Sequence, residues 1–123
     1  MVKKKLLQGI DTIIVRVSDI ESSKKWYEEK LKLTPIWDDS NIKLVVFDTG
    51  SPTSLTIWQT DKLIENNKET SSYPIFRTFD AQIARQELQE KGVNVGEVIN
   101  DNFVKYFFFY DPDGNVLEAC QVH

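Results

Sequence analysis

A glutamate and a cysteine near the carboxyl end of the chain are the first residues whose types and spacing could do chemistry. Glu118 and Cys120 lie in the stretch YDPDGNVLEAC (110–120), where they alternate with Leu117 and Ala119. In a β-strand, this alternation places the two apolar residues toward a core and Glu118 and Cys120 on the opposite face. A carboxylate there could serve as a general base, a metal ligand or the partner of a cation. Cys120 has no neighbouring histidine to activate it, so we expect a packed thiol.

The composition restricts the partners of this chemistry. The chain has 123 residues, 28% of them charged and 41% hydrophobic, with a net charge of −4. These values are typical of one globular domain and argue against a nucleic-acid partner. No apolar run approaches the roughly 20 residues of a membrane span, and the apolar run after Lys3-Lys4-Lys5 is too short for a signal peptide. Because a single cysteine cannot form an internal disulfide, we expect a cytoplasmic protein without a membrane partner.

The elements that must position Glu118 follow from an internal repeat. Residues 12–33 (TIIVRVSDIESSKKWYEEKLKL) align without a gap with residues 73–94 (YPIFRTFDAQIARQELQEKGVN) at an offset of 61. Each copy has an alternating apolar run, an arginine, an aspartate and then a helical pattern. Asp19 and Asp80 stand where helix N-caps are expected, and Gly92 predicts the end of the second helix.

Strand-like segments follow each predicted helix and complete the repeat. They cover 34–37, 42–47 and 55–60 in the first copy, and 95–99, 104–110 and 115–122 in the second. The polar stretch DKLIENNKETSS (61–72) is typical of a connecting loop, and DPDG (111–114) predicts a tight turn. The sequence therefore predicts an α+β fold made of two βαβββ modules, at about 9–60 and 73–122, within one domain (1–123).

The residues that carry this repeat resemble the vicinal oxygen chelate superfamily of glyoxalases, bleomycin-resistance proteins and extradiol dioxygenases. The likeness rests on IIVRVSDIESSKKWYEEKLKL (13–33) and FFYDPDGNVLEAC (108–120), and the two-module layout extends it over nearly the whole chain. The resemblance implies a strongly curved, mixed eight-stranded sheet in which each module forms half of a cup. It also implies a homodimer, because short single-chain members usually pair module one of one subunit with module two of the other.

Metalloenzymes of this superfamily hold a divalent ion with one side chain from the first and last strand of each module. Residue-by-residue alignment puts these positions at Thr12, Thr56, Tyr73 and Glu118. Only Glu118 is a ligand of the expected kind, since such sites use imidazole and carboxylate groups. The one histidine, His123, lies outside the motif. We therefore predict that the protein holds no metal ion and no other cofactor.

The side chains that point into the cup suit a small-molecule pocket, with a few polar groups among aromatic ones. The predicted ligand-binding residues are Thr12, Arg16, Thr56, Trp58, Tyr73, Arg77, Tyr106 and Phe108. Aromatic strand residues could instead fill the cup as core, but two inward arginines would be poor core filler. In the glyoxalase branch the position of Arg16 contacts the carboxylate end of glutathione, so the resemblance implies an anionic or aromatic ligand. A surface position or a salt bridge is the alternative role for Arg16.

Two functions stay open at this level. The first is a metal-free binding protein, similar to bleomycin-resistance proteins, that holds an aromatic or acidic small molecule between subunits. The second is an enzyme: a divergent glyoxalase-like lyase or isomerase with Glu118 as the catalytic base, or a metal-dependent dioxygenase whose ligands the alignment misses. The absence of histidine from all four superfamily ligand positions favours the binding protein. Without a metal ion, Arg16 or Arg77, of the same subunit or across the dimer, is the expected partner of the Glu118 carboxylate.

Overall fold

The computed structural model describes residues 6–123, so the basic run Lys3-Lys4-Lys5 lies outside the described residues. The first module contains β1 (Thr12–Val17), α1 (Ile20–Leu31), β2 (Thr34–Asp39), β3 (Leu44–Asp48) and β4 (Ser54–Gln59). The second contains β5 (Ile75–Arg77), α2 (Ala81–Glu90), β6 (Asn94–Val95), β7 (Ile99–Asn100), β8 (Val104–Tyr110) and β9 (Val116–Val122). No helix in the described part of the chain is long and apolar enough to cross a membrane.

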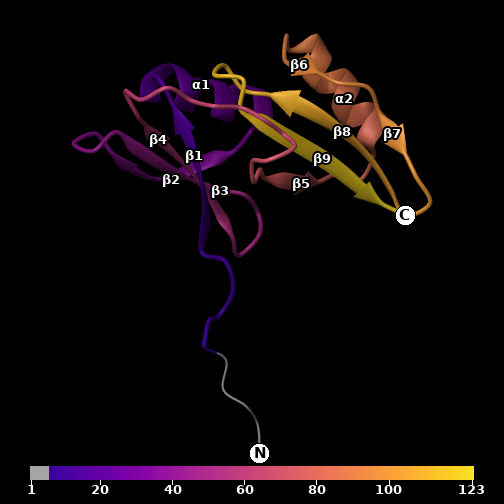
Figure 1. Cartoon of the computed structure of the whole chain (residues 1–123), viewed down its shortest axis with the longest axis horizontal. Helices are drawn as coiled ribbons and strands as arrows, with labels where there is room; N and C mark the ends of the chain where they lie inside the picture. Colours follow the sequence, from indigo (N-terminus) through magenta and orange to yellow (C-terminus); the bar gives the residue numbers. More distant parts are fainter. Residues whose placement is uncertain (1–5) are drawn as a thin grey trace, which may run out of the picture.

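The strands form two sheets that repeat one topology. The order is β1-β4-β3-β2 in the first sheet and β5-β9-β8-β6 in the second, with β7 also paired to β8. In both sheets the first strand of the module runs parallel to the last. Figure 1 shows α1 and α2 on the same side of the two sheets, which leaves the opposite faces free of helices. We call these faces the first half-cup (Thr12, Ile14, Arg16, Thr56 and Trp58) and the second half-cup (Tyr73, Ile75, Arg77, Tyr106, Phe108, Glu118 and Cys120).

Both predicted N-caps are confirmed. The Asp19 carboxylate accepts hydrogen bonds from the backbone N–H groups of Glu21 and Ser22, and the Asp80 carboxylate accepts one from that of Ile83. These bonds satisfy helix donors that have no partner within the helix. Gly92 follows α2 with a φ of +83°, a left-handed conformation that glycine adopts without strain. In both modules, therefore, an aspartate N-cap connects the first strand to its helix.

The predicted alternation along the strands is also confirmed. The buried residues include Val15 and Val17 on β1, Phe107 and Phe109 on β8, and Leu117 and Ala119 on β9. All of them belong to one apolar cluster that takes in residues of both modules, among them Tyr27 of α1 and Leu88 of α2. Because side chains alternate along a strand, the residues between them lie on the half-cup faces.

The single strand predicted at 95–99 is divided into β6 and β7. Between them, the N–H of Gly96 donates to the carbonyl oxygen of Phe108 at 2.7 Å, and the carbonyl of Gly96 accepts from Nε of Arg85 at 2.6 Å. A Cβ atom at Gly96 would lie 3.4 Å from that Phe108 carbonyl oxygen. The close backbone approach interrupts the regular ladder, which is a common role of glycine within strands.

The resemblance implies eight strands, and the structure has nine strands in two sheets within residues 6–123. Within residues 6–123, no strand pairing joins β1 to β5, the facing edge strands of the two sheets. Pro74, directly before β5, has no N–H group to donate across this seam. Two cavities lie at this seam, and each of them is lined by Ile13 of β1 and by Pro74. The α+β class and the repeated module layout are as predicted, and the two half-cups are separate surfaces in one chain.

The DPDG turn holds the two modules together. One oxygen of the Asp111 carboxylate accepts from the Tyr27 hydroxyl of α1 at 2.7 Å and from Asn115 Nδ2 at 2.9 Å. The other oxygen accepts from the backbone N–H groups of Asp113 and Asn115 at 3.0 and 2.8 Å. Tyr27 and Asp111 are buried, and burial raises the pKa of both groups. We call Tyr27, Asp111 and Asn115 the inter-module lock.

Candidate functional site

The two threonines of the first half-cup bind each other. The hydroxyl oxygens of Thr12 and Thr56 are 2.7 Å apart, and the Thr12 hydroxyl also lies 3.2 Å from the carbonyl oxygen of Ser54. Thr56 is only 3% exposed. These neutral hydroxyls therefore already have hydrogen-bond partners within their own sheet.

Arg16 lies along the surface of the same half-cup. Its Nε donates to the carbonyl of Trp58 and its Nη2 to the carbonyl of Gln59, both at 3.1 Å. Its Cζ atom is 4.6 Å from the centroid of the Trp58 ring, a cation–π contact. A guanidinium has five N–H donors, so the donors that remain can still bind an anion at this exposed position.

Three aromatic rings line the second half-cup. The ring centroid of Phe108 is 5.8 Å from that of Tyr73 and 5.9 Å from that of Tyr106, and both contacts are edge-to-face. A lysine that the sequence analysis did not single out completes the group, because Lys68 Nζ lies 4.8 Å from the Phe108 ring centroid. Lys68 belongs to the linker (residues 61–72), where a polar composition alone does not indicate contact with an aromatic cluster.

Glu118 is placed at the floor of the second half-cup, on the face predicted from the alternation of β9, and neither arginine of the same chain pairs with it. It is 7% exposed, and it pairs in register with Phe108 on β8 and with Ile75 on β5. No ion pair between Glu118 and either Arg16 or Arg77 occurs in the described residues. Burial raises the pKa of the Glu118 carboxyl. The site therefore contains a carboxylate that forms no ion pair within residues 6–123.

The second arginine and the cysteine lie beside each other on neighbouring strands. Arg77 of β5 pairs in register with Cys120 of β9. Burial and the nearby Glu118 carboxylate raise the pKa of the Cys120 thiol. A raised thiol pKa keeps the sulfur protonated at neutral pH and disfavours a nucleophilic role, in agreement with the expected packed thiol.

The residues at the four superfamily ligand positions do not fit a divalent transition metal. Thr12 and Thr56 supply neutral hydroxyls that bond to each other, and Tyr73 supplies a phenol. Such groups are poor ligands beside the imidazole and carboxylate groups that zinc, iron or nickel sites use. Residues 6–123 contain no group of three histidine, cysteine, aspartate or glutamate side chains arranged to hold a metal ion.

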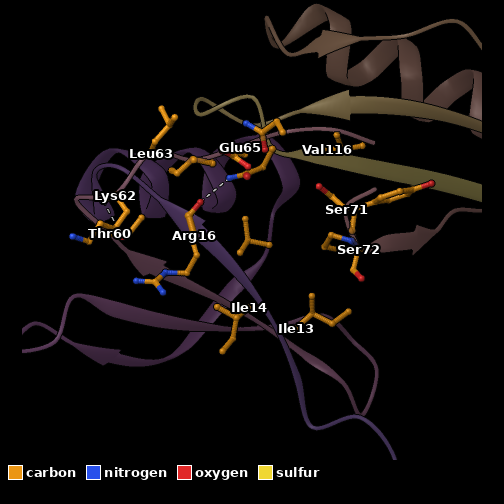
Figure 2. Close-up of a pocket in the computed structure, with 16 residues that line it drawn as sticks. Ile13, Ile14, Arg16, Thr60, Lys62, Leu63, Glu65, Ser71, Ser72 and Val116 are labelled. Atoms are coloured by element: carbon orange, nitrogen blue, oxygen red, sulfur yellow. Dashed lines mark hydrogen bonds between the residues drawn. The ribbon is translucent and has the colours of Figure 1, made fainter. Parts of the chain in front are cut away.

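A cavity of about 370 Å³ opens between β1 and the linker. Figure 2 shows Ile14 and Arg16 of β1 across this cavity from Ser71 and Ser72 of the linker. Of the predicted ligand-binding residues, Arg16 and Tyr73 line it, while Arg77 lines a second cavity of about 470 Å³ at the other end of the seam. The linker residues of the first cavity were missed from the sequence, because nothing in their pattern distinguishes them from a solvated loop.

We expect Glu118→Gln to stabilise the protein at pH 7. The pKa of Glu118 is higher in the folded state than in the unfolded state, so the folded state binds more protons between the two values. Wild-type stability therefore falls as the pH rises through a window that begins near the unfolded pKa of about 4.3. Urea denaturation should give Glu118→Gln the higher midpoint at pH 7, with the difference shrinking toward pH 4.

Glu29→Gln serves as the control for a simple loss of negative charge, because Glu29 is exposed and belongs to none of the ion pairs of residues 6–123. Should Glu118→Gln instead destabilise the protein at pH 7 while Glu29→Gln does not, a cation must neutralise Glu118 in solution. The most direct source of such a cation would be a second subunit.

Comparison with known proteins agrees with this architecture. The model of the Glyoxalase/Bleomycin resistance protein/Dioxygenase superfamily matches residues 9–119. No curated protein matches the sequence. Among solved structures, the chain is similar to TnmS3, an antibiotic binding protein from Streptomyces sp. CB03234. The two chains share 25% identity with a TM-score of 0.81, and the match covers 98% of this chain and 100% of TnmS3.

Two further solved structures show the same fold at lower identity. The integron cassette protein HFX_CASS4, from the mobile metagenome of the Halifax Harbour sewage outfall, has 21% identity and a TM-score of 0.80 over 94% of this chain and 100% of its own. A glyoxalase family protein from Enterococcus faecalis has 21% identity and a TM-score of 0.77 over 94% and 99%. With two βαβββ modules in place and a family model that spans both, the chain belongs to the glyoxalase/bleomycin resistance protein/dioxygenase superfamily.

Proposed function

We propose that this protein binds a small aromatic or acidic molecule without a metal ion, in a cup that two subunits complete. The observation that carries the proposal is the donor set at the four superfamily ligand positions, where only Glu118 is a suitable ligand and the two threonines bond to each other. The name of TnmS3, an antibiotic binding protein, supports a binding role for this fold.

The half-cups supply the two kinds of contact that such a ligand needs. Trp58 on the first half-cup and Phe108 on the second offer ring faces or edges to a flat apolar body. Arg16 is exposed and has N–H donors beyond the two that bind strand carbonyls, so it can donate to a ligand carboxylate in a charge-assisted pair. Arg77, at the far end of the seam, is the second source of positive charge.

A homodimer is the predicted assembly. Ile14 and Ile75 occupy equivalent positions of the repeat, on the cup side of the edge strands β1 and β5, and are 51% and 57% exposed. A second subunit seated over the half-cups through a two-fold interface would cover both residues. Sedimentation at micromolar concentration should therefore give twice the chain mass of 14.3 kDa.

Matched aspartate variants test which face is used. Ile14→Asp should weaken the dimer, whereas Ile83→Asp should not, because Ile83 is a 65% exposed residue of α2, on the helical side of the molecule. A wild-type monomer at this concentration would refute the shared cup. So would a dimer that only Ile83→Asp disrupts.

No stoichiometric zinc, nickel, iron or manganese should accompany the protein. Elemental analysis after purification without chelators is the measurement, and it should find well below one metal ion per chain. One tightly held equivalent that is lost in Glu118→Gln but kept in Glu97→Gln would contradict the prediction and support a metal-dependent enzyme.

A thermal-shift screen tests the proposed function directly. The compounds are aromatic carboxylic acids, their neutral amides and non-aromatic acids of similar size. A true ligand at a hundred times its Kd adds about 2.7 kcal/mol to the apparent stability, and we expect aromatic acids to rank first. Failure of every aromatic compound to stabilise the protein would overturn the proposal, and chemical turnover of a stabilising compound would replace it with the lyase or isomerase function.

A further inference from the structure

The second half-cup holds a carboxylate with no ion-pair partner among the described residues. Glu118 is 7% exposed, and none of the ion pairs of residues 6–123 includes it. Every fully buried side-chain oxygen or nitrogen in the same residues has a hydrogen-bond partner. The oxygens of Glu118, which have none, must therefore be the part of the side chain that keeps contact with the outside. Water is then the partner of these oxygens in the free protein, and a ligand donor or cation that enters the half-cup can replace it.

An aromatic wall stands directly beside this carboxylate. Phe108 is the residue opposite Glu118 in the antiparallel β8–β9 pair, so the two side chains are nearest neighbours on one face. Tyr73 and Tyr106 approach Phe108 with edge-to-face geometry. A ring face next to an unpaired carboxylate is the combination that attracts organic cations, through the ring quadrupole and the opposite charge together.

The chain already places an ammonium group on this wall. Lys68 Nζ lies 4.8 Å from the centroid of the Phe108 ring. Its linker is held to the DPDG turn by a 2.8 Å hydrogen bond from Asn66 Nδ2 to the carbonyl of Asp113. Even so, Lys68 is not within ion-pair distance of Glu118. The Phe108 ring therefore accommodates a cation, while the neighbouring Glu118 carboxylate can still pair with a cation from a ligand.

From this geometry we propose that the second half-cup is a subsite for a protonated amine of the ligand, with Phe108 as the ring face, Glu118 as the counter-ion and Lys68 as the internal cation that the amine displaces. The inference rests on the proposed function and adds a charge pattern to it. Arg16 gives the first half-cup a positive group. The second half-cup has Arg77 opposite Cys120, but the charged group opposite the Phe108 ring is the Glu118 carboxylate. A ligand with an acid at one end and an amine at the other satisfies both.

Three small probes of the same shape test the subsite: phenethylamine, phenethyl alcohol and phenylacetate. Each is titrated into ¹⁵N-labelled protein, and the Kd is read from the amide shifts of β8 and β9. A charge-assisted pair in a partly dry site corresponds to a factor of about ten or more in affinity, so the amine should bind about tenfold more tightly than the alcohol. Glu118→Gln should reduce this preference to about twofold or less, because it removes the charge and keeps the shape.

Lysine variants separate the internal cation from a general change in charge. Lys68→Met should tighten the amine about two- to fivefold, since the exposed cation–π contact that the amine must displace is lost. Lys62→Met, in the same linker but on the first cavity, removes the same charge and should leave the amine Kd within about twofold.

The outcomes distinguish this inference from the proposed function. Equal binding of amine and alcohol, or weaker amine binding in Lys68→Met, would overturn the amine subsite while leaving a small-molecule cup. If none of the three probes shifts an amide signal at millimolar concentration, the proposed function and the subsite are both overturned.

Discussion

Asp111→Ala should lower the free energy of unfolding by about 3–4 kcal/mol, the largest effect that we expect from a polar substitution in this chain. The variant leaves the buried Tyr27 hydroxyl without its acceptor and removes the oxygens that bind Asn115 Nδ2 and two backbone N–H groups of the turn. A buried donor without a partner alone costs about 1–3 kcal/mol. In urea, the midpoint should fall by more than about 1 M.

Two companion variants show whether this loss reflects the inter-module lock. Tyr27→Phe removes the hydroxyl but leaves the turn intact, so it should cost about 1–2 kcal/mol. Asp101→Ala is the control, because Asp101 also accepts two backbone N–H bonds in a turn but is exposed and does not contact the other module. We expect a clearly smaller loss there, because water replaces the lost hydrogen bonds of an exposed side chain. Similar losses for Asp111→Ala and Asp101→Ala would reduce the lock to an ordinary turn contact.

Arg16→Met should weaken an aromatic acid identified in the screen by tenfold or more and leave its neutral amide almost unaffected. A guanidinium paired with a carboxylate in a partly dry site contributes about 1.5–3 kcal/mol, and about 1.4 kcal/mol already corresponds to tenfold. Methionine keeps much of the bulk over Trp58 but cannot donate hydrogen bonds. Isothermal titration calorimetry of the acid and the amide gives both numbers on one preparation.

The control for the change in net charge is Arg85→Met. Arg85 carries the same charge on α2, in the other module from Arg16, and donates to the carbonyl of Gly96. It should leave the Kd of the acid within about twofold. If Arg16→Met weakens the acid and the amide equally, the hydrogen bonds of Arg16 to Trp58 and Gln59 are its whole role and the anion must bind elsewhere.

Local features of the structure were predictable from the sequence, because they depend on neighbours along the chain. Asp19 and Asp80 cap their helices as the repeat indicated, and alternation placed Phe107 in the core and Phe108 on the half-cup. Strand side chains alternate and helix N-termini need an acceptor whatever the rest of the fold does. The largest difference is the strand predicted at 95–99, which is divided into β6 and β7 on either side of the close approach of Gly96 to Phe108.

The candidate site was predicted in part, as a set of residues on one face but not as a set of contacts. The alternation of side chains along the strand correctly put Glu118 on the face away from the core. Alternation alone did not show whether an arginine side chain would lie beside Glu118. The structure instead places Arg16 on Trp58 in the other module and Arg77 next to Cys120. Which charged groups meet depends on how two sheets far apart in the chain are arranged, and periodicity carries no information on that arrangement.

The amino-acid sequence by itself determined the repeat, the order of the elements, the direction in which each strand residue points and the poor fit of the metal positions, because each follows from residue type and local spacing. Only the tertiary structure decided that Asp111 binds Tyr27, that Lys68 of the linker lies on Phe108 and that Glu118 forms no ion pair within residues 6–123. The two contacts join segments separated by tens of residues, and they form when the modules pack against each other and the linker folds back over them. The same packing decides which charged groups come near Glu118.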